Sequence, residues 1–179
     1  AGVLATPAPK LSAALGKSVD GPSSALFLPY LSGERTPVGD SQVRGLMMGL
    51  GHETDAKTMT HAVMDSIAFA LRDSLEALQV GGSKVKRVMA VGGGTHSELW
   101  LKIIATVLGV PVDLPAAGAV GGAFGAARLG LIAATGENHK RVLNKPKIAK
   151  TIDPDKQSKS AYDDHYHRYT KIYPAIKGI

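Results

Sequence analysis

Three consecutive glycines, Gly92–Gly94, follow an apolar run and directly precede a predicted helix. Glycines remove side-chain bulk, so a ligand can approach the backbone closely. A helix beginning at this point would direct free N–H groups and the positive end of its dipole toward an anion. A strand, a glycine turn and a helix also follow one another in α/β proteins without any ligand. The turn therefore predicts a phosphate or nucleotide site, with an unliganded connection as the alternative.

Two other glycine fingerprints are absent from the sequence. No Gly-x-x-x-x-Gly-Lys-Ser/Thr follows a predicted strand, and the glycines of residues 118–125 do not fit Gly-x-Gly-x-x-Gly. Thr95 and Glu98 are spaced as a capping box, which predicts that the helix starts there. A nucleotide at this turn would thus be held by neither a Walker-type loop nor a dinucleotide fingerprint.

Hydrophobic periodicity predicts the elements that position the turn. A strand over 86–91, a helix over 97–108 and a strand over 111–114 together form a β-α-β unit. Upstream, the sequence predicts a short helix over 10–15, strands over 25–31 and 44–50, and a long amphipathic helix over 54–78 that ends at Gly81-Gly82. These patterns indicate an α/β fold.

A last core helix is predicted over 120–133, and it is rich in glycine and alanine. Each glycine within a helix costs about 1 kcal/mol relative to alanine. Close packing against the sheet would compensate for that cost. Alternatively, the N-terminus of this helix faces the same cleft as Gly92–Gly94.

Composition limits the possible functions. The chain has 179 residues, 44% of them hydrophobic, no cysteine and a net charge of +6. It shows neither an apolar run of membrane-spanning length nor a signal peptide, so we expect a cytoplasmic protein without a membrane partner.

The positive charge is concentrated near the C-terminal end. Residues 1–135 carry 11 basic and 10 acidic side chains, whereas residues 136–179 carry 10 and 5. We divide the chain into a nucleotide-side domain over 1–135, a basic linker over 136–156 and an amphipathic helix over 157–179. The basic segment has no nucleic-acid motif, so we interpret it as a solvated linker, with an anion-binding patch as the alternative.

Four tyrosines lie on one side of the predicted C-terminal helix. They are Tyr162, Tyr166, Tyr169 and Tyr173. An amphipathic face of this kind usually packs on its own protein, and a partner interface is the alternative.

Four sequence blocks, taken in order, resemble the C-terminal part of the FGGY carbohydrate kinases over about residues 1–175. The blocks are residues 27–37, Arg44-Gly45, Gly92–Gly94 with Ser97, and residues 121–130. The Leu-Ser-Gly-Glu-Arg-Thr-Pro loop over 31–37 is typical of the xylulokinases within that family. The resemblance implies the incomplete C-terminal ATPase domain, ribonuclease-H-like and actin-like, of a two-domain sugar kinase.

The resemblance also implies ligands and residue roles. ATP with Mg2+ would donate a phosphoryl group to a ketopentose sugar in the full-length enzyme. Gly92, Gly93 and Gly94 match the turn that passes under the nucleotide, and Ser97 stands where relatives contact the adenine. Gly2 matches a glycine of another adenine-pocket element.

The chain departs from the family pattern in two ways. Ala119 replaces an acidic residue that many relatives carry. The sugar-binding domain, the general base and the phosphate-gripping hairpin of the family would all lie upstream. We therefore expect no catalytic residue in this chain, no activity of the chain alone and self-association into a homo-oligomer. The alternatives are a related kinase for ribulose, gluconate or glycerol, and a non-catalytic nucleotide-binding module.

Overall fold

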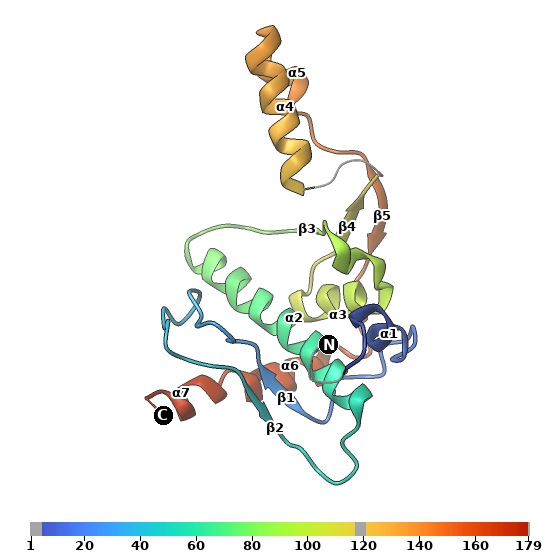
Figure 1. Cartoon of the computed structure of the whole chain (residues 1–179), viewed down its shortest axis with the longest axis vertical. Coiled ribbons are helices and arrows are strands. Elements are labelled where there is room, and N and C mark those ends of the chain that lie inside the picture. The colour runs from blue at the N-terminus through green and yellow to red at the C-terminus, as the bar shows by residue number, and fades with distance from the viewer. Residues whose placement is uncertain (1–4, 117–120, 179) are drawn as a thin grey trace.

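The computed structural model describes residues 5–116 and 121–178, in which two small sheets lie beside a central group of helices (Figure 1). The first half of the chain supplies α1 (Ala8–Ala13), β1 (Leu26–Leu28), β2 (Leu46–Met48), α2 (Ala56–Val80), β3 (Val88–Met89) and the 3₁₀ helix η1 (Gly93–His96). The second half supplies α3 (Glu98–Leu108), β4 (Val112–Pro115), α4 (Gly121–Thr135), α5 (His139–Val142), β5 (Ile148–Ile152), α6 (Lys159–Tyr169) and α7 (Ile172–Ile176). None of the helices in the described part is long and apolar enough to cross a membrane.

The β-α-β unit around the glycine turn is confirmed. Strand β3 pairs in parallel with β4, and α3 lies between them in the sequence. The other sheet is the antiparallel pair β1 and β2. The strands predicted over 25–31 and 44–50 are therefore present, although each is only three residues long.

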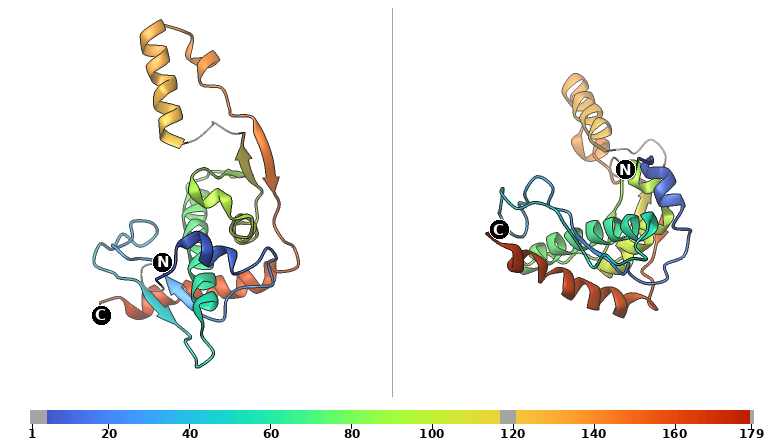
Figure 2. Two further views of the ribbon diagram at one scale, coloured as in Figure 1. Left: turned by 45° about the vertical axis from the view of Figure 1, so that its right-hand side comes forward. Right: turned by 60° about the horizontal axis from the view of Figure 1, so that its bottom comes forward.

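Helix α2 forms the centre of the fold. The Asp55 carboxylate caps its N-terminus by accepting a hydrogen bond from the Thr58 amide at 2.8 Å, and Gly81 ends it. Its buried residues, among them Ala68 and Phe69, join a core with α3, α6 and β1. Helix α6 packs against α2, and the right-hand view of Figure 2 shows the two helices next to each other.

The tyrosine face of the C-terminal segment packs on the protein's own core, as predicted. Tyr162, Tyr166 and Tyr169 of α6 are buried, and their rings lie 5.3–6.5 Å from the Phe69 ring. The predicted single helix over 157–179 is two helices, because the chain leaves α6 at Thr170 and resumes as α7 at Ile172.

The apolar stripe that the sequence shows along α2 does not face this core. Leu71 and Leu78, together with Met89 and Val91 after α2, are between 43% and 54% exposed. They line a groove of about 520 Å³ between α2, β3 and α3. Helix α2 therefore has two apolar faces, and the tyrosines of α6 cover only one of them.

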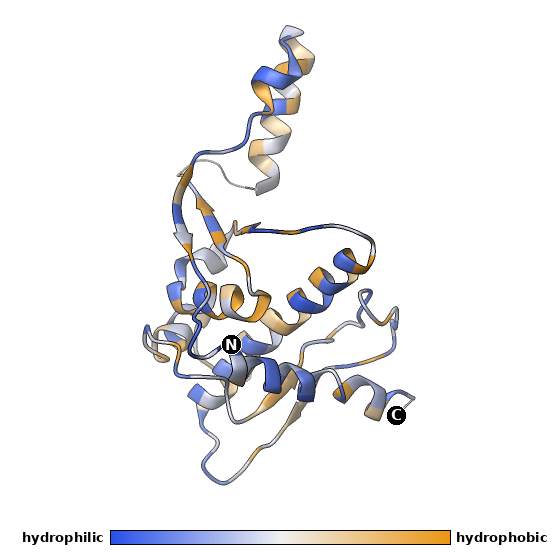
Figure 3. Cartoon of the chain, turned by 180° about the vertical axis from the view of Figure 1, so that it is seen from behind, coloured by the Kyte–Doolittle hydropathy of each residue, from blue (hydrophilic) through white to orange (hydrophobic). Residues whose placement is uncertain are grey.

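The glycine-rich helix α4 is not a core helix, which corrects the sequence-based expectation. It has no buried residue, and it extends away from the body with α5 beside it (Figure 1). A Cβ added at Gly122, Gly125 or Gly130 would meet no atom outside the helix backbone within 4 Å, so no other described part of the chain packs against these glycines. Figure 3 shows hydrophobic segments along this helix, where Leu129 is 61% exposed.

The basic segment over 136–156 is not simply a solvated linker. Residues Ile148–Ile152 form β5, which pairs antiparallel with β4, and α5 lies upstream of it. Ile152 is buried beneath the sheet, and Thr151 Oγ1 donates a hydrogen bond to Asp113 Oδ1 at 2.6 Å. The strand forms despite the high charge of the segment, because it pairs with β4 and Ile152 packs in a small core with Val112 and Ala105.

In the described part of the chain, β3 pairs with a strand on one side only, which leaves one edge of its sheet open. The Val88 and Ala90 amides donate to carbonyls of the β4 side at 3.0 and 2.9 Å, so the amide of Met89 between them points away. We predict that the isolated chain self-associates through this edge and the adjoining groove. Met89→Lys should weaken association in sedimentation velocity, while Val80→Lys, at a site 90% exposed outside the groove, should not. A wild-type chain that stays monomeric at all concentrations would contradict this prediction.

Asp73 makes the contact between α2 and α6 pH-dependent. Burial, together with the nearby Glu76 and Glu34, raises the pKa of Asp73 to about 6, although Tyr166 donates a hydrogen bond to it at 2.6 Å and Arg72 lies nearby. The pKa of Asp73 in the folded state exceeds the ordinary value of 3.8, so the fold favours the protonated carboxyl. Its contribution to the free energy of unfolding is fully present below pH 3.8 and is lost as pH rises through 6. Asp73→Asn, which keeps an acceptor for Tyr166, should therefore raise the melting temperature at pH 8 but not at pH 4.

Asp163→Asn is a control of opposite sign. Although burial acts in the other direction, ion pairs with Lys159 and Arg72 lower the pKa of Asp163. Removing that carboxylate should destabilise the chain at pH 8 and at pH 4, with the effect fading only as pH falls below 3.8. Parallel pH profiles for the two variants would contradict the assignment.

Candidate nucleotide-binding turn

The glycine turn is exposed and leads directly from β3 into η1 and α3. Gly92 has φ 93° and ψ −174°, a backbone conformation that side-chain-bearing residues rarely adopt. A Cβ added at Gly92 or Gly93 would meet no atom within 4 Å. The backbone at these two residues is thus accessible to a ligand.

The capping box predicted at Thr95 is wrong. The side chain of Ser97 caps α3 by accepting a hydrogen bond from the Trp100 amide at 3.3 Å. Thr95 Oγ1 donates to the Gly92 carbonyl at 2.7 Å and so closes the turn. Residues Gly93–His96 form a 3₁₀ helix, so the α-helix begins at Glu98 and not after Thr95.

Ser97 connects the turn to the N-terminal segment. Ser12 of α1 donates a hydrogen bond from its Oγ to Ser97 Oγ at 2.8 Å. A serine hydroxyl has two acceptor sites and one hydrogen to donate. Ser12 and the Trp100 amide occupy both acceptor sites, and no acceptor for the Ser97 hydrogen lies among the described residues, so this hydrogen is available to a ligand.

The first turn of α3 holds an ion pair. Lys150 of β5 lies 2.8 Å from Glu98 Oε1, and this hydrogen bond and the charge of Lys150 lower the pKa of Glu98. The strand β5 therefore places one of the basic side chains of the 136–156 segment next to the turn. Sequence analysis missed this contact, because no local pattern shows that β5 pairs beside β4.

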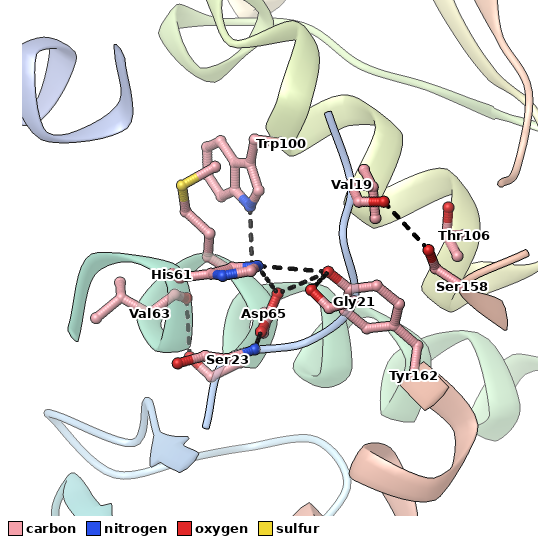
Figure 4. Close-up of polar contacts among 12 residues, drawn as sticks. Val19, Gly21, Ser23, His61, Val63, Asp65, Trp100, Thr106, Ser158 and Tyr162 are labelled. Atoms are coloured by element: carbon pink, nitrogen blue, oxygen red, sulfur yellow. Dashed lines mark hydrogen bonds and ion pairs between the residues drawn. The ribbon is translucent and has the colours of Figure 1, made fainter. Parts of the chain in front are cut away.

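A polar cluster centred on Asp65 joins α2 and α6 to the loop after α1 (Figure 4). Asp65 is 1% exposed, and its Oδ2 accepts from the Ser23 amide at 2.8 Å. Its Oδ1 accepts from Tyr162 Oη at 3.3 Å and lies 3.4 Å from His61 Nε2. Tyr162 Oη also lies 3.1 Å from the Gly21 carbonyl.

The charge of Asp65 affects its neighbours. Although burial opposes the change, Asp65 raises the pKa of His61. Burial and the same carboxylate raise the pKa of Tyr162, which therefore stays a hydrogen-bond donor. Sequence analysis also missed this cluster, and the available signal was an acidic residue in the middle of an otherwise apolar helix face.

Two residues of interest to sequence analysis, Gly2 and Ala119, lie outside the described residues. Gly92, Gly93, Gly94 and Ser97 are brought together in one continuous surface turn, as predicted. Their contacts with a nucleotide remain a prediction.

The comparison with known proteins identifies the family. The sequence profile of the FGGY family of carbohydrate kinases, C-terminal domain, matches residues 5–134. The chain belongs to the FGGY family of carbohydrate kinases. The mixed α/β structure described above is thus that of an FGGY C-terminal domain.

Within the FGGY family, the chain is similar to xylulose kinases. It is 34% identical to the xylulose kinase of Escherichia coli K12 over 169 residues, which cover 94% of this chain and 35% of that protein. A crystal structure of the Brucella ovis enzyme matches with 48% identity and a TM-score of 0.90, covering 98% of this chain and 37% of that one. The xylulose kinase of Rhodospirillum rubrum matches with 28% identity and a TM-score of 0.76, covering 94% and 34%. The FGGY domain described here thus spans about a third of the length of these relatives.

The cap at Ser97 yields a stability prediction. Ser97→Ala should lower the free energy of unfolding by about 1 kcal/mol, because the Trp100 amide loses its acceptor. Ser97→Asp keeps an acceptor at this position and should stay within about 0.5 kcal/mol of the wild type. Urea denaturation followed by circular dichroism measures both values. An equal loss of unfolding free energy in the two variants would show that Ser97 does not stabilise the chain by capping α3.

Proposed function

We propose that this chain supplies the adenosine side of the ATP site of a xylulose kinase. The observation that carries the proposal is the exposed turn at Gly92–Gly94, whose first two glycines are open to a ligand and which leads into the capped N-terminus of α3. The names of the relatives support the reaction, since several are xylulose kinases.

The polar groups of the turn suit a nucleotide. Among the described residues, the Ser97 and Trp100 amides have acceptors, at Gly94 and Ser97, and the first-turn amides of Glu98 and Leu99 stay available for a polar ligand atom. The free hydrogen of Ser97 would be donated to a ring nitrogen of adenine. The positive end of the α3 dipole favours the negative charge of the phosphates.

We propose that Mg2+ reaches the site bound to the phosphates of ATP. No group of three or more His, Asp or Glu side chains in the described part of the chain could hold a metal ion. Mg2+ at phosphoryl-transfer sites is commonly held by few protein carboxylates together with phosphate oxygens. When bound, Mg2+ neutralises the phosphate charge.

The proposed complete reaction converts D-xylulose and ATP to D-xylulose 5-phosphate and ADP. A hydroxyl oxygen of the sugar forms the new bond to the γ-phosphorus, the bond to the β-phosphate oxygen breaks, and a general base accepts the hydroxyl proton. We place that base and the sugar site in the part of the enzyme that this chain does not contain. The chain alone would then be inactive, because positioning of both reactants provides much of such catalysis.

An assay of ADP release tests this function. The natural gene product that contains this chain is supplied with Mg-ATP and, separately, D-xylulose, D-ribulose, gluconate and glycerol, with the 179-residue chain as the control. We expect strong preference for D-xylulose and no turnover by the chain alone. Preference for another of the sugars would indicate a different FGGY kinase. ATP binding without turnover of any sugar would favour a non-catalytic nucleotide-binding module.

A further inference from the structure

Trp100 is the single tryptophan of the chain, and it lies between the glycine turn and α2. Its indole Nε1–H donates a hydrogen bond to the Met64 carbonyl of α2 at 3.1 Å. The ring is half-buried and packs against the main hydrophobic core. A large planar side chain held by both packing and a hydrogen bond has a fixed orientation.

The indole also contacts Gly94. A Cβ added at Gly94 would lie 2.5 Å from Trp100 Cζ3 and 3.1 Å from Cε3, whereas one added at Gly92 or Gly93 would meet nothing within 4 Å. Gly94 does not adopt the positive φ of Gly92. The absence of a side chain at Gly94 therefore serves a different purpose, which is to let its backbone rest against the indole.

The support beneath Trp100 is rigid. Met64 directly precedes Asp65, whose two carboxylate oxygens bind the Ser23 amide and Tyr162. Figure 4 shows Trp100 next to this cluster, with the indole nitrogen directed toward it. The chain of contacts from Gly94 through Trp100 to Met64 thus connects the exposed turn to the most buried part of α2.

We infer that Trp100 is a positioning residue for nucleotide binding, because it holds the Gly94 backbone in a fixed position relative to α2. This inference rests on the proposed function, because it assigns Trp100 to the same ATP site. Trp100 would act through Gly94 and need not touch the nucleotide. Loss of the indole would let the turn move, and a side chain at Gly94 would push the turn away from α3.

A double-mutant cycle tests the coupling. In the natural gene product that contains this chain, Gly94→Ala and Trp100→Leu should each raise the KM for ATP about tenfold, with the KM for D-xylulose unchanged. The double variant Gly94→Ala/Trp100→Leu should be no worse than Trp100→Leu alone, because the added methyl group no longer meets the indole. Phe69→Leu is the matched control, since Phe69 is fully buried in the same core but contacts the α6 tyrosines instead of the turn.

The fluorescence of Trp100 gives a second readout. Because the chain has no other tryptophan, substituting tyrosine or phenylalanine for any tryptophans elsewhere in the gene product would isolate its signal. We expect its emission to change on titration with Mg-ATP in the wild type and in Phe69→Leu. In Gly94→Ala the change should need about tenfold more nucleotide.

Three results would overturn the inference. The first is that the effects of Gly94→Ala and Trp100→Leu on the KM for ATP multiply, which would show that the two residues act independently. The second is that Phe69→Leu raises the KM for ATP as much as Trp100→Leu at an equal loss of thermal stability, which would reduce Trp100 to a general core residue. The third is a wild-type enzyme that neither binds ATP nor turns over, which would overturn the proposed function as well. The first two results require an active wild type, so they overturn only the role of Trp100.

Discussion

The packing of α3 against α2 determines where every other part of the candidate site lies. One end of α3 carries Ser97 and the glycine turn, and its buried residues, such as Ile103, join the core that α2 shares with α6. Because protein interiors are close-packed, a shift of α2 would move α3 and the turn with it. The position of the accessible Gly92 backbone therefore depends on buried contacts between α3 and α2.

Buried polar groups give that core a single arrangement. Asp65 and Asp73 are both buried on α2, and each accepts a hydrogen bond from a tyrosine of α6. A displaced α6 would leave Asp73 without its tyrosine and Asp65 with only the Ser23 amide and His61, which is energetically unfavourable. The tyrosines thus fix the register of α6 on α2 as well as contributing hydrophobic contact.

Elements with strong hydrophobic periodicity were predictable from the sequence, whereas features set by tertiary contacts were not. The boundaries of α2 and α3 were predicted to within about two residues, because apolar spacing and the glycines that end α2 are local signals. The cap of α3 was assigned to Thr95 instead of Ser97. The 3₁₀ helix at Gly93–His96 was missed, since it depends on the backbone of Gly92. The position of α4 was also wrong, because glycine and alanine allow close packing without showing whether a neighbour is present. The contact of Gly94 with Trp100 joins residues six apart through a turn whose shape the sequence does not reveal.

The central claim, that the turn at Gly92–Gly94 receives the nucleotide, is tested most directly by amide chemical shifts. A 15N-labelled sample of the gene product would be titrated with Mg-ATP, and shifts of the backbone amides would be mapped onto the fold. We predict saturable changes at Gly92, Gly93 and the first turn of α3, with amides of α4 unaffected. Saturable binding that leaves Gly92 and Gly93 unchanged while other amides move would contradict the claim.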